Sequence, residues 1–245
     1  MRSNDIFKIL SLAGVILSLG GCADEKSDLE QARYLLGKGD TADAQTALGI
    51  LQPMLTSTSG EDKFETVRLY VGAQLQAAGF DGIKVIANIV YQDSNDIVSV
   101  LEKAITFTAD AQSRIADASA TVQAFILSAD FTNSTNVQKK QGIYFQFGQT
   151  RMDEALRVLF TVSGLSGTFD VNTCTANFQQ SFAQFNNINV DLTDAHTQFN
   201  ASGIDDTNKL NTLLTKEQAK LPTTNDQAKI AQFCQDLQSQ HTHAQ

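Results

Sequence analysis

Six residues in this chain of 245 carry side chains that commonly do covalent or metal chemistry: three cysteines and three histidines. A thiol can be acylated, oxidised to a disulfide or bound to a metal, and an imidazole can bind a metal or move protons. His241 and His243 lie in a polar tail, and His196 has no cysteine or histidine at ligand spacing. No nucleophile-elbow, metalloprotease, Walker or dinucleotide-binding motif accompanies them. These residues predict no metal, no cofactor and no enzymatic activity.

The first cysteine follows an N-terminal segment that is typical of export. Arg2 and Lys8 give the segment a weakly basic start, and residues 9–19 are apolar and uncharged. This apolar run is too short to span a bilayer as a helix, which takes about 20 residues. Residues 1–21 are therefore predicted to be a secretory signal.

Residues 19–22 (LGGC) resemble the lipobox of bacterial lipoproteins. The resemblance implies cleavage between Gly21 and Cys22 and acyl chains, such as palmitate, on the Cys22 residue. Two or three acyl chains anchor a protein durably to a membrane. The resemblance also implies the outer membrane rather than the inner one, because Ala23 and not aspartate follows the cysteine, with residues 22–27 as a short tether. The alternative is a plain secretory signal that happens to contain a cysteine.

The two remaining cysteines predict a disulfide. Exported proteins meet an oxidising environment. Cys174 shares an apolar helical stripe with Phe178, and Cys234 shares one with Ile230, so both thiols are expected to face the core. Closing a loop of about 60 residues stabilises a fold by about 4 kcal/mol on the chain-entropy model. The alternative is two inert buried thiols.

The elements that must position these residues are predicted to be helices. Apolar residues recur with a period near 3.6 through residues 28–240, and the chain has only two prolines. Hairpin signals and sustained alternation are missing from the sequence. We expect an all-α fold of about ten to twelve short helices, with Thr41 capping an early helix and a frayed tail over residues 241–245. The helices form either one domain or two closely packed halves that meet near residues 131–136.

Small and large apolar residues around one glycine turn resemble a tetratricopeptide repeat. The matching residues are Ala32, Leu35, Gly39, Ala44, Leu48 and Leu51. A second copy is expected over residues 150–159, with Ala155 and Leu159 at packing positions. The resemblance implies stacked helix pairs whose curved surface binds partners and does no chemistry. The alternative is an irregular antiparallel helical bundle.

Aromatic residues are dense in the low-charge second half of the chain. Those that could line a groove are Tyr144, Phe147, Phe178, Phe182 and Phe185. Two interpretations stay open for them: packing in the core, or an apolar groove for a ligand or a partner helix.

The charge balance excludes one large class of partners. The chain has 18 basic and 27 acidic side chains, and removal of residues 1–21 leaves 16 and 26, a net charge of −10. Binding to DNA or RNA through phosphate neutralisation needs clustered Lys and Arg, so no nucleic-acid partner is expected. An acidic body is also repelled by anionic lipids, which leaves membrane attachment to the acyl chains on Cys22.

The first functional hypothesis is a lipid-anchored helical scaffold that faces the periplasm and binds a protein partner in an envelope assembly. The alternative is an accessory lipoprotein that binds a small ligand for a periplasmic uptake system of the TRAP type. An enzyme is a distant third, because no nucleophile, base and orienting group can be proposed together.

Overall fold

The computed structural model describes residues 23–80, 107–163, 169–203, 211–212, 215–216 and 218–244. Every regular element with assigned bounds in these ranges is a helix, which confirms the all-α prediction. Nine helices have assigned bounds in the described residues: α2 (Ala23–Gly37), α3 (Thr41–Ser57), α4 (Gly60–Ala77), α7 (Ala111–Ile126), α8 (Ala129–Asn133), α9 (Val137–Ser163), α10 (Val171–Gln180), α11 (Phe182–Ser202) and α13 (Gln227–Ala244).

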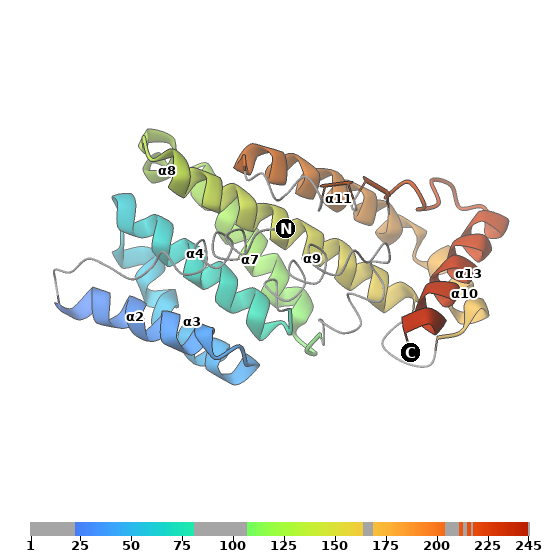
Figure 1. Ribbon diagram of the computed structural model, residues 1–245, viewed down its shortest axis with the longest axis horizontal. Helices are drawn as coiled ribbons and strands as arrows, with labels where there is room; N and C mark the ends of the chain where they lie inside the picture. The colour runs from blue at the N-terminus through green and yellow to red at the C-terminus, as the bar shows by residue number, and fades with distance from the viewer. Residues whose placement is uncertain are drawn as a thin grey trace, which may run out of the picture.

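The helices pack in the order of the chain, each long helix against its neighbour (Figure 1). Helix α2 lies against α3, α3 against α4, α4 against α7, and α7 against α9. Helix α11 covers another side of α9, and α10 and α13 pack on each other at the end of the molecule opposite α8. The result is an elongated stack with the 27-residue helix α9 at its centre.

The turn between α2 and α3 follows directly from its residue types. Gly39 has a φ of 81°, a left-handed conformation that glycine adopts without the steric cost of a Cβ atom. Asp40 is the N-cap of α3, and its Oδ1 accepts a hydrogen bond of 2.7 Å from the Asp43 amide. The expected cap, Thr41, is instead the first helical residue. Two good N-cap residues are adjacent here, and the carboxylate takes the role.

Two hydrophobic clusters hold the stack together. The smaller one lies between α2, α3 and α4, and it contains the apolar residues matched to the repeat: Ala32, Leu35, Ala44, Leu48 and Leu51. Of these five residues, Ala32, Ala44 and Leu51 are completely buried. The larger cluster runs from α4 through α7 and α9 to α13. The apolar residues of the first predicted copy therefore pack together between α2, α3 and α4.

The second predicted copy of the repeat is wrong. Residues 150–159 lie inside α9, so no turn begins a new helix there. Thr150 is completely buried, and its hydroxyl donates to the Phe147 carbonyl at 2.8 Å, within the same helix. Ala155 and Leu159 are buried in the larger cluster, but as part of one continuous helix. No glycine or proline interrupts this stretch, so nothing in the local sequence ends the helix.

The structure also bears on three predicted boundaries. The core is continuous across residues 131–136, because the buried ring of Phe131 lies 5.7 Å from that of Phe64 and 5.4 Å from that of Tyr144. Helix α13 extends to Ala244, where a frayed tail was expected. Helix α2 begins at Ala23, so residues 23–27 of the predicted short tether are helical.

The contact between α9 and α11 depends on one glycine. A Cβ atom at Gly148 would lie 2.7 Å from two ring carbons of Phe199, which is completely buried. We predict that Gly148→Ala lowers the free energy of unfolding by about 1–3 kcal/mol, because the ring has no free space to enter.

Gly142→Ala is the matched control, because Gly142 lies in the same helix and a Cβ atom there meets nothing within 4 Å. This variant should gain about 1 kcal/mol from helix propensity. Urea unfolding of both variants measures the difference, and equal stabilities would contradict the close approach of α9 and α11.

Candidate functional site

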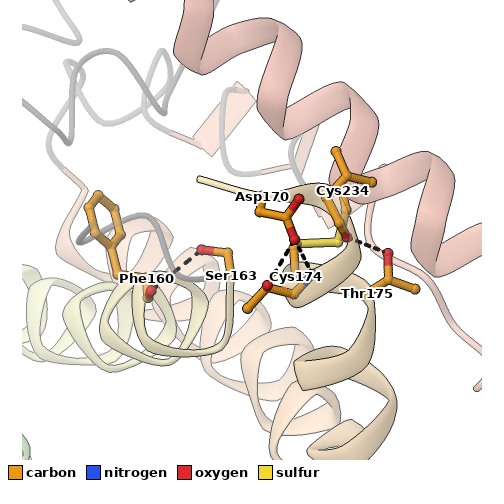
Figure 2. The surroundings of a disulfide bond; sticks show 8 residues. Phe160, Ser163, Asp170, Cys174, Thr175 and Cys234 are labelled. Atoms are coloured by element: carbon orange, nitrogen blue, oxygen red, sulfur yellow. Dashed lines mark hydrogen bonds between the residues drawn. A yellow bond between two sulfur atoms is a disulfide. The ribbon is translucent and has the colours of Figure 1, made fainter. Parts of the chain in front are cut away.

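The disulfide joins α10 to α13 (Figure 2). Cys174 and Cys234 are both completely buried, and their Cα atoms lie 6.0 Å apart. The rings of Phe178 and Phe233 pack edge to face beside them, with centroids 5.5 Å apart. The pairing predicted from the two apolar stripes is present in the structure, and it ties the last helix to α10.

The start of α10 is fixed by a short polar network next to the disulfide (Figure 2). Asp170 is the N-cap, and its Oδ2 accepts hydrogen bonds from the amide and the hydroxyl of Thr173 at 2.7 and 2.8 Å. These bonds hold the pKa of the Asp170 carboxyl below its usual range. An ionised carboxylate at a helix N-terminus also interacts favourably with the helix dipole.

The other predicted site residues are not brought together as a site. Gly21 and Cys22 lie outside the described residues. Of the two interpretations left open for the aromatic residues, packing in the core agrees with the described residues: Phe147 and Phe178 are buried in the larger cluster, and Tyr144 and Phe182 pack against it, half-buried. These rings fill the space between helices, and the side chain of Phe185 lies outside the described part.

The strongest concentration of charge lies between α9 and α11. Arg151 on α9 has its Nη1 atom 3.5 Å from a carboxylate oxygen of Glu154 and 3.5 Å from one of Asp191. Its Nε atom lies 3.9 Å from Asp194, and its guanidinium stands 5.2 Å from the centre of the Phe147 ring. The Arg151 guanidinium therefore contacts one carboxyl group on its own helix and two on α11.

Asp191 is the most perturbed member of this cluster. Its side chain is 9 % exposed. Burial is the main cause that raises the pKa of Asp191 to about 7, the negative charge of Glu154 raises it further, and Arg151 opposes both. A carboxyl with this pKa exchanges its proton near neutral pH, where an ordinary aspartate is fully ionised.

Asp153 is a second unusual acid, but it does not share a site with Asp191. It is completely buried, and neither carboxyl oxygen has a hydrogen-bond partner. Burial raises the pKa of Asp153 well above its ordinary value, so the group is held uncharged. Asp153 and Arg151 are two residues apart on α9, which places them about 200° apart around the helix. The two acids therefore do not form the acid–base pair that hydrolytic chemistry would need.

A further polar network joins α4 to α7. The Tyr70 hydroxyl and the Gln74 amide donate to Oδ2 of Asp117 at 2.5 and 2.6 Å. Burial and the hydrogen bond to Asp117 raise the pKa of Tyr70 to about 12. Arg114 donates to Oε1 of Gln74 at 3.3 Å. Tyr70 thus stays protonated as a hydrogen-bond donor, and the network is a structural link between the two helices.

One shallow polar depression of about 340 Å³ lies beside α11. Its lining residues are His196, Asn200, Asn211, Thr212 and Thr215. Asn211 donates to Oδ1 of Asn200 at 2.8 Å, and the Asn200 amide nitrogen lies 3.3 Å from Nε2 of His196. The lining holds no carboxylate, so His196 has no orienting acid among these residues.

Comparison with known proteins adds no relative. No protein-family model, no curated protein and no solved structure matches this chain. Within the described residues, no cluster of three or more His, Cys, Asp and Glu side chains could hold a metal ion. None of the described helices is both long and apolar enough to cross a membrane. The observations that bear on function are therefore the lipobox-like residues 19–22 and the helical stack itself.

Sequence reasoning missed the buried acids, although the sequence holds a signal for them. Asp153 lies at helical spacing from Leu156 and Phe160, and Asp191 lies at helical spacing from Ile188 and Ala195. An acid at a position of an apolar helical stripe can mark a carboxyl on the buried face of a helix. The structure shows that both acids are buried.

The disulfide generates a stability prediction. Replacing Cys174 and Cys234 by alanine in a Cys22→Ser background should lower the free energy of unfolding by about 4 kcal/mol, because a loop of about 60 residues is no longer closed in the unfolded chain. Urea unfolding with and without reductant measures the effect. Reductant should destabilise the Cys22→Ser protein and leave the triple variant unchanged. If neither protein responded to reductant, the result would contradict a stabilising disulfide.

Asp191 generates a pH prediction. Its folded-state pKa of about 7 exceeds the ordinary value of 3.8, so its contribution to stability is complete below pH 4 and is lost as pH rises through 7. Asp191→Asn removes this titration. The stability of the variant relative to the original protein should therefore rise between pH 4 and 7, by at most about 1.4 kcal/mol per pH unit.

Asp194→Asn is the matched control for this experiment. Asp194 contacts the same Arg151 guanidinium, but its side chain is 46 % exposed. Solvent screens an exposed carboxylate, so we expect a much smaller slope for this variant. Urea unfolding at a series of pH values measures both, and equal slopes would contradict a special role for burial at Asp191.

Proposed function

We propose that the protein is a lipid-anchored, non-enzymatic helical scaffold of the bacterial cell envelope, attached through Cys22 and docked to a protein partner. The observation that carries the proposal is the lipobox-like sequence of residues 19–22, which stands immediately before the first residue of α2. An acylated Cys22 would thus be joined to a helix of the folded body without an intervening linker.

Two further observations support this proposal. The Cys174–Cys234 disulfide suits the oxidising compartment to which residues 1–21 would export the chain. The α2–α3 pair presents Tyr34 with 69 % of its surface exposed, beside Lys38, whose Nζ stands 5.0 Å from the centre of the ring. Exposed aromatic side chains are common at protein interfaces. The described rings that were expected to line a ligand groove pack in or against the core, which weighs against the ligand-binding alternative.

The test has two parts, one for membrane location and one for contact with a partner. Cys22→Ser should abolish lipid labelling and move the protein from the membrane fraction to the soluble fraction, because no acyl chain is attached. A photo-crosslinking phenylalanine analogue in place of Tyr34 should give one discrete covalent adduct with the membrane-attached protein, detected by gel shift and mass spectrometry.

The same analogue in place of Val190 is the control, because Val190 is similarly exposed at 57 % but lies on α11. Membrane attachment of the Cys22→Ser protein would overturn the anchor. A correctly anchored protein that gives no adduct from Tyr34, or equal adducts from both positions, would argue against docking through the α2–α3 pair.

A further inference from the structure

Several helix ends meet at the end of the molecule that carries α8 (Figure 1). The amide of Gly60, which begins α4, donates to Oδ1 of Asp130 in α8 at 2.9 Å. Lys139, near the start of α9, pairs with Glu61 at 3.0 Å. The end of α7 leads through Ser128 directly into α8. The ends of α4, α7 and α9 therefore form one surface around α8.

Helix α2 begins at this same end. Arg33 of α2 pairs with Glu65 of α4 at 3.1 Å, and the two helices run in the same direction because each is antiparallel to α3. Ala23 precedes Arg33 by ten residues, or about 15 Å of helix, and Gly60 precedes Glu65 by five, or about 8 Å. The first residue of α2 thus extends slightly beyond the start of α4.

Two large apolar side chains are exposed around α8. Leu127, which follows α7, is 77 % exposed, and Val137, which begins α9, is 58 % exposed. Only two other large hydrophobic side chains of the described residues are comparably exposed, Tyr34 and Val190, and both lie on other helices. We name the surface formed by Leu127, α8 and Val137 the α8 end.

The charges at the α8 end are balanced, unlike those of the whole body. Three lysines and three acids lie in α8 and in the first turns of α4 and α9: Lys63, Lys139, Lys140, Glu61, Asp62 and Asp130. The chain without residues 1–21 carries a net charge of −10, so most of its surface is repelled by anionic phospholipids. The residues around α8 have no net charge, and their lysines can extend their charged groups into water while the apolar tips enter the lipid.

We infer that the α8 end is a membrane-contact surface, which rests against the bilayer with Leu127 and Val137 in the interfacial layer. This inference rests on the proposed anchor at Cys22. The bilayer is the occupant because the chain outside the described residues joins the body at Ala23, at this same end. Acyl chains on Cys22 would bring the α8 end to the lipid surface, and the apolar tips would then fix the orientation of the body.

The chain contains no tryptophan, so a single introduced tryptophan reports its own surroundings. Residues 22–245 carrying Leu127→Trp or Val137→Trp are coupled through the Cys22 thiol to a maleimide lipid in vesicles of phosphatidylethanolamine and phosphatidylglycerol. We expect the emission of both reporters to shift to shorter wavelength on the vesicles and to be quenched by brominated acyl chains.

Val190→Trp is the matched control. Val190 adjoins Asp191, which pairs with Arg151, and Arg151 lies 14 residues along α9 from Val137, about 21 Å away. Its emission should be the same with and without coupling. Reporters at the α8 end that remain unquenched, or that are quenched no more than Val190→Trp, would overturn the inference.

Two other results are informative. A blue shift of Leu127→Trp that grows with protein concentration without vesicles would show that a second copy covers the α8 end, and it would overturn the inference as well. Chemical coupling does not depend on acylation in the cell. A failure of the membrane-contact surface is therefore distinguishable from a failure of the anchor, which the fractionation of Cys22→Ser tests separately.

Discussion

The burial of α9 on several sides is the constraint on which the rest of the structure depends. This helix contacts α4, α7, α10 and α11, so it has few positions where a polar group can reach water. A buried polar group must be paired or kept uncharged. Gln146 donates to the Arg68 carbonyl at 2.7 Å, Arg151 pairs with carboxylates of α11, and Asp153 has a raised pKa. The helix that orders the layers therefore also concentrates the unusual charges.

The fold class could be predicted from the sequence, because the 3.6-residue period reports which face of a helix is buried. The period does not report where a helix ends. Residues 150–159 matched the repeat because any buried helix places small and large apolar residues at this spacing. A true repeat also needs a turn before its second helix, and the residues here do not break the helix. The same limit explains the predicted groove: a stripe containing Phe178 does not show that the ring of Phe233 lies against it.

The disulfide could be predicted from the sequence, whereas the electrostatic environment of the buried acids could not. Cys174 and Cys234 could be paired from the sequence, because both were expected on buried faces and the predicted role of Cys22 left them only each other as partners. The raised pKa of Asp191 could not be predicted, because its environment comes from another helix: Glu154 and Arg151 act on it across the contact with α9. Long-range electrostatics of this kind has no local pattern in the sequence. It becomes visible only when the packing partner is known.

The helical start of α2 changes what an anchor at Cys22 would do. A flexible linker of six residues spans about 13 Å on average and lets the body rotate freely. A helix that begins at Ala23 leaves about one residue of freedom between the acyl chains and the folded stack. The body would then keep one end toward the bilayer and present the same helices to the periplasm. Such pre-orientation lowers the entropic cost of docking a partner, which is the property that a membrane-attached scaffold requires.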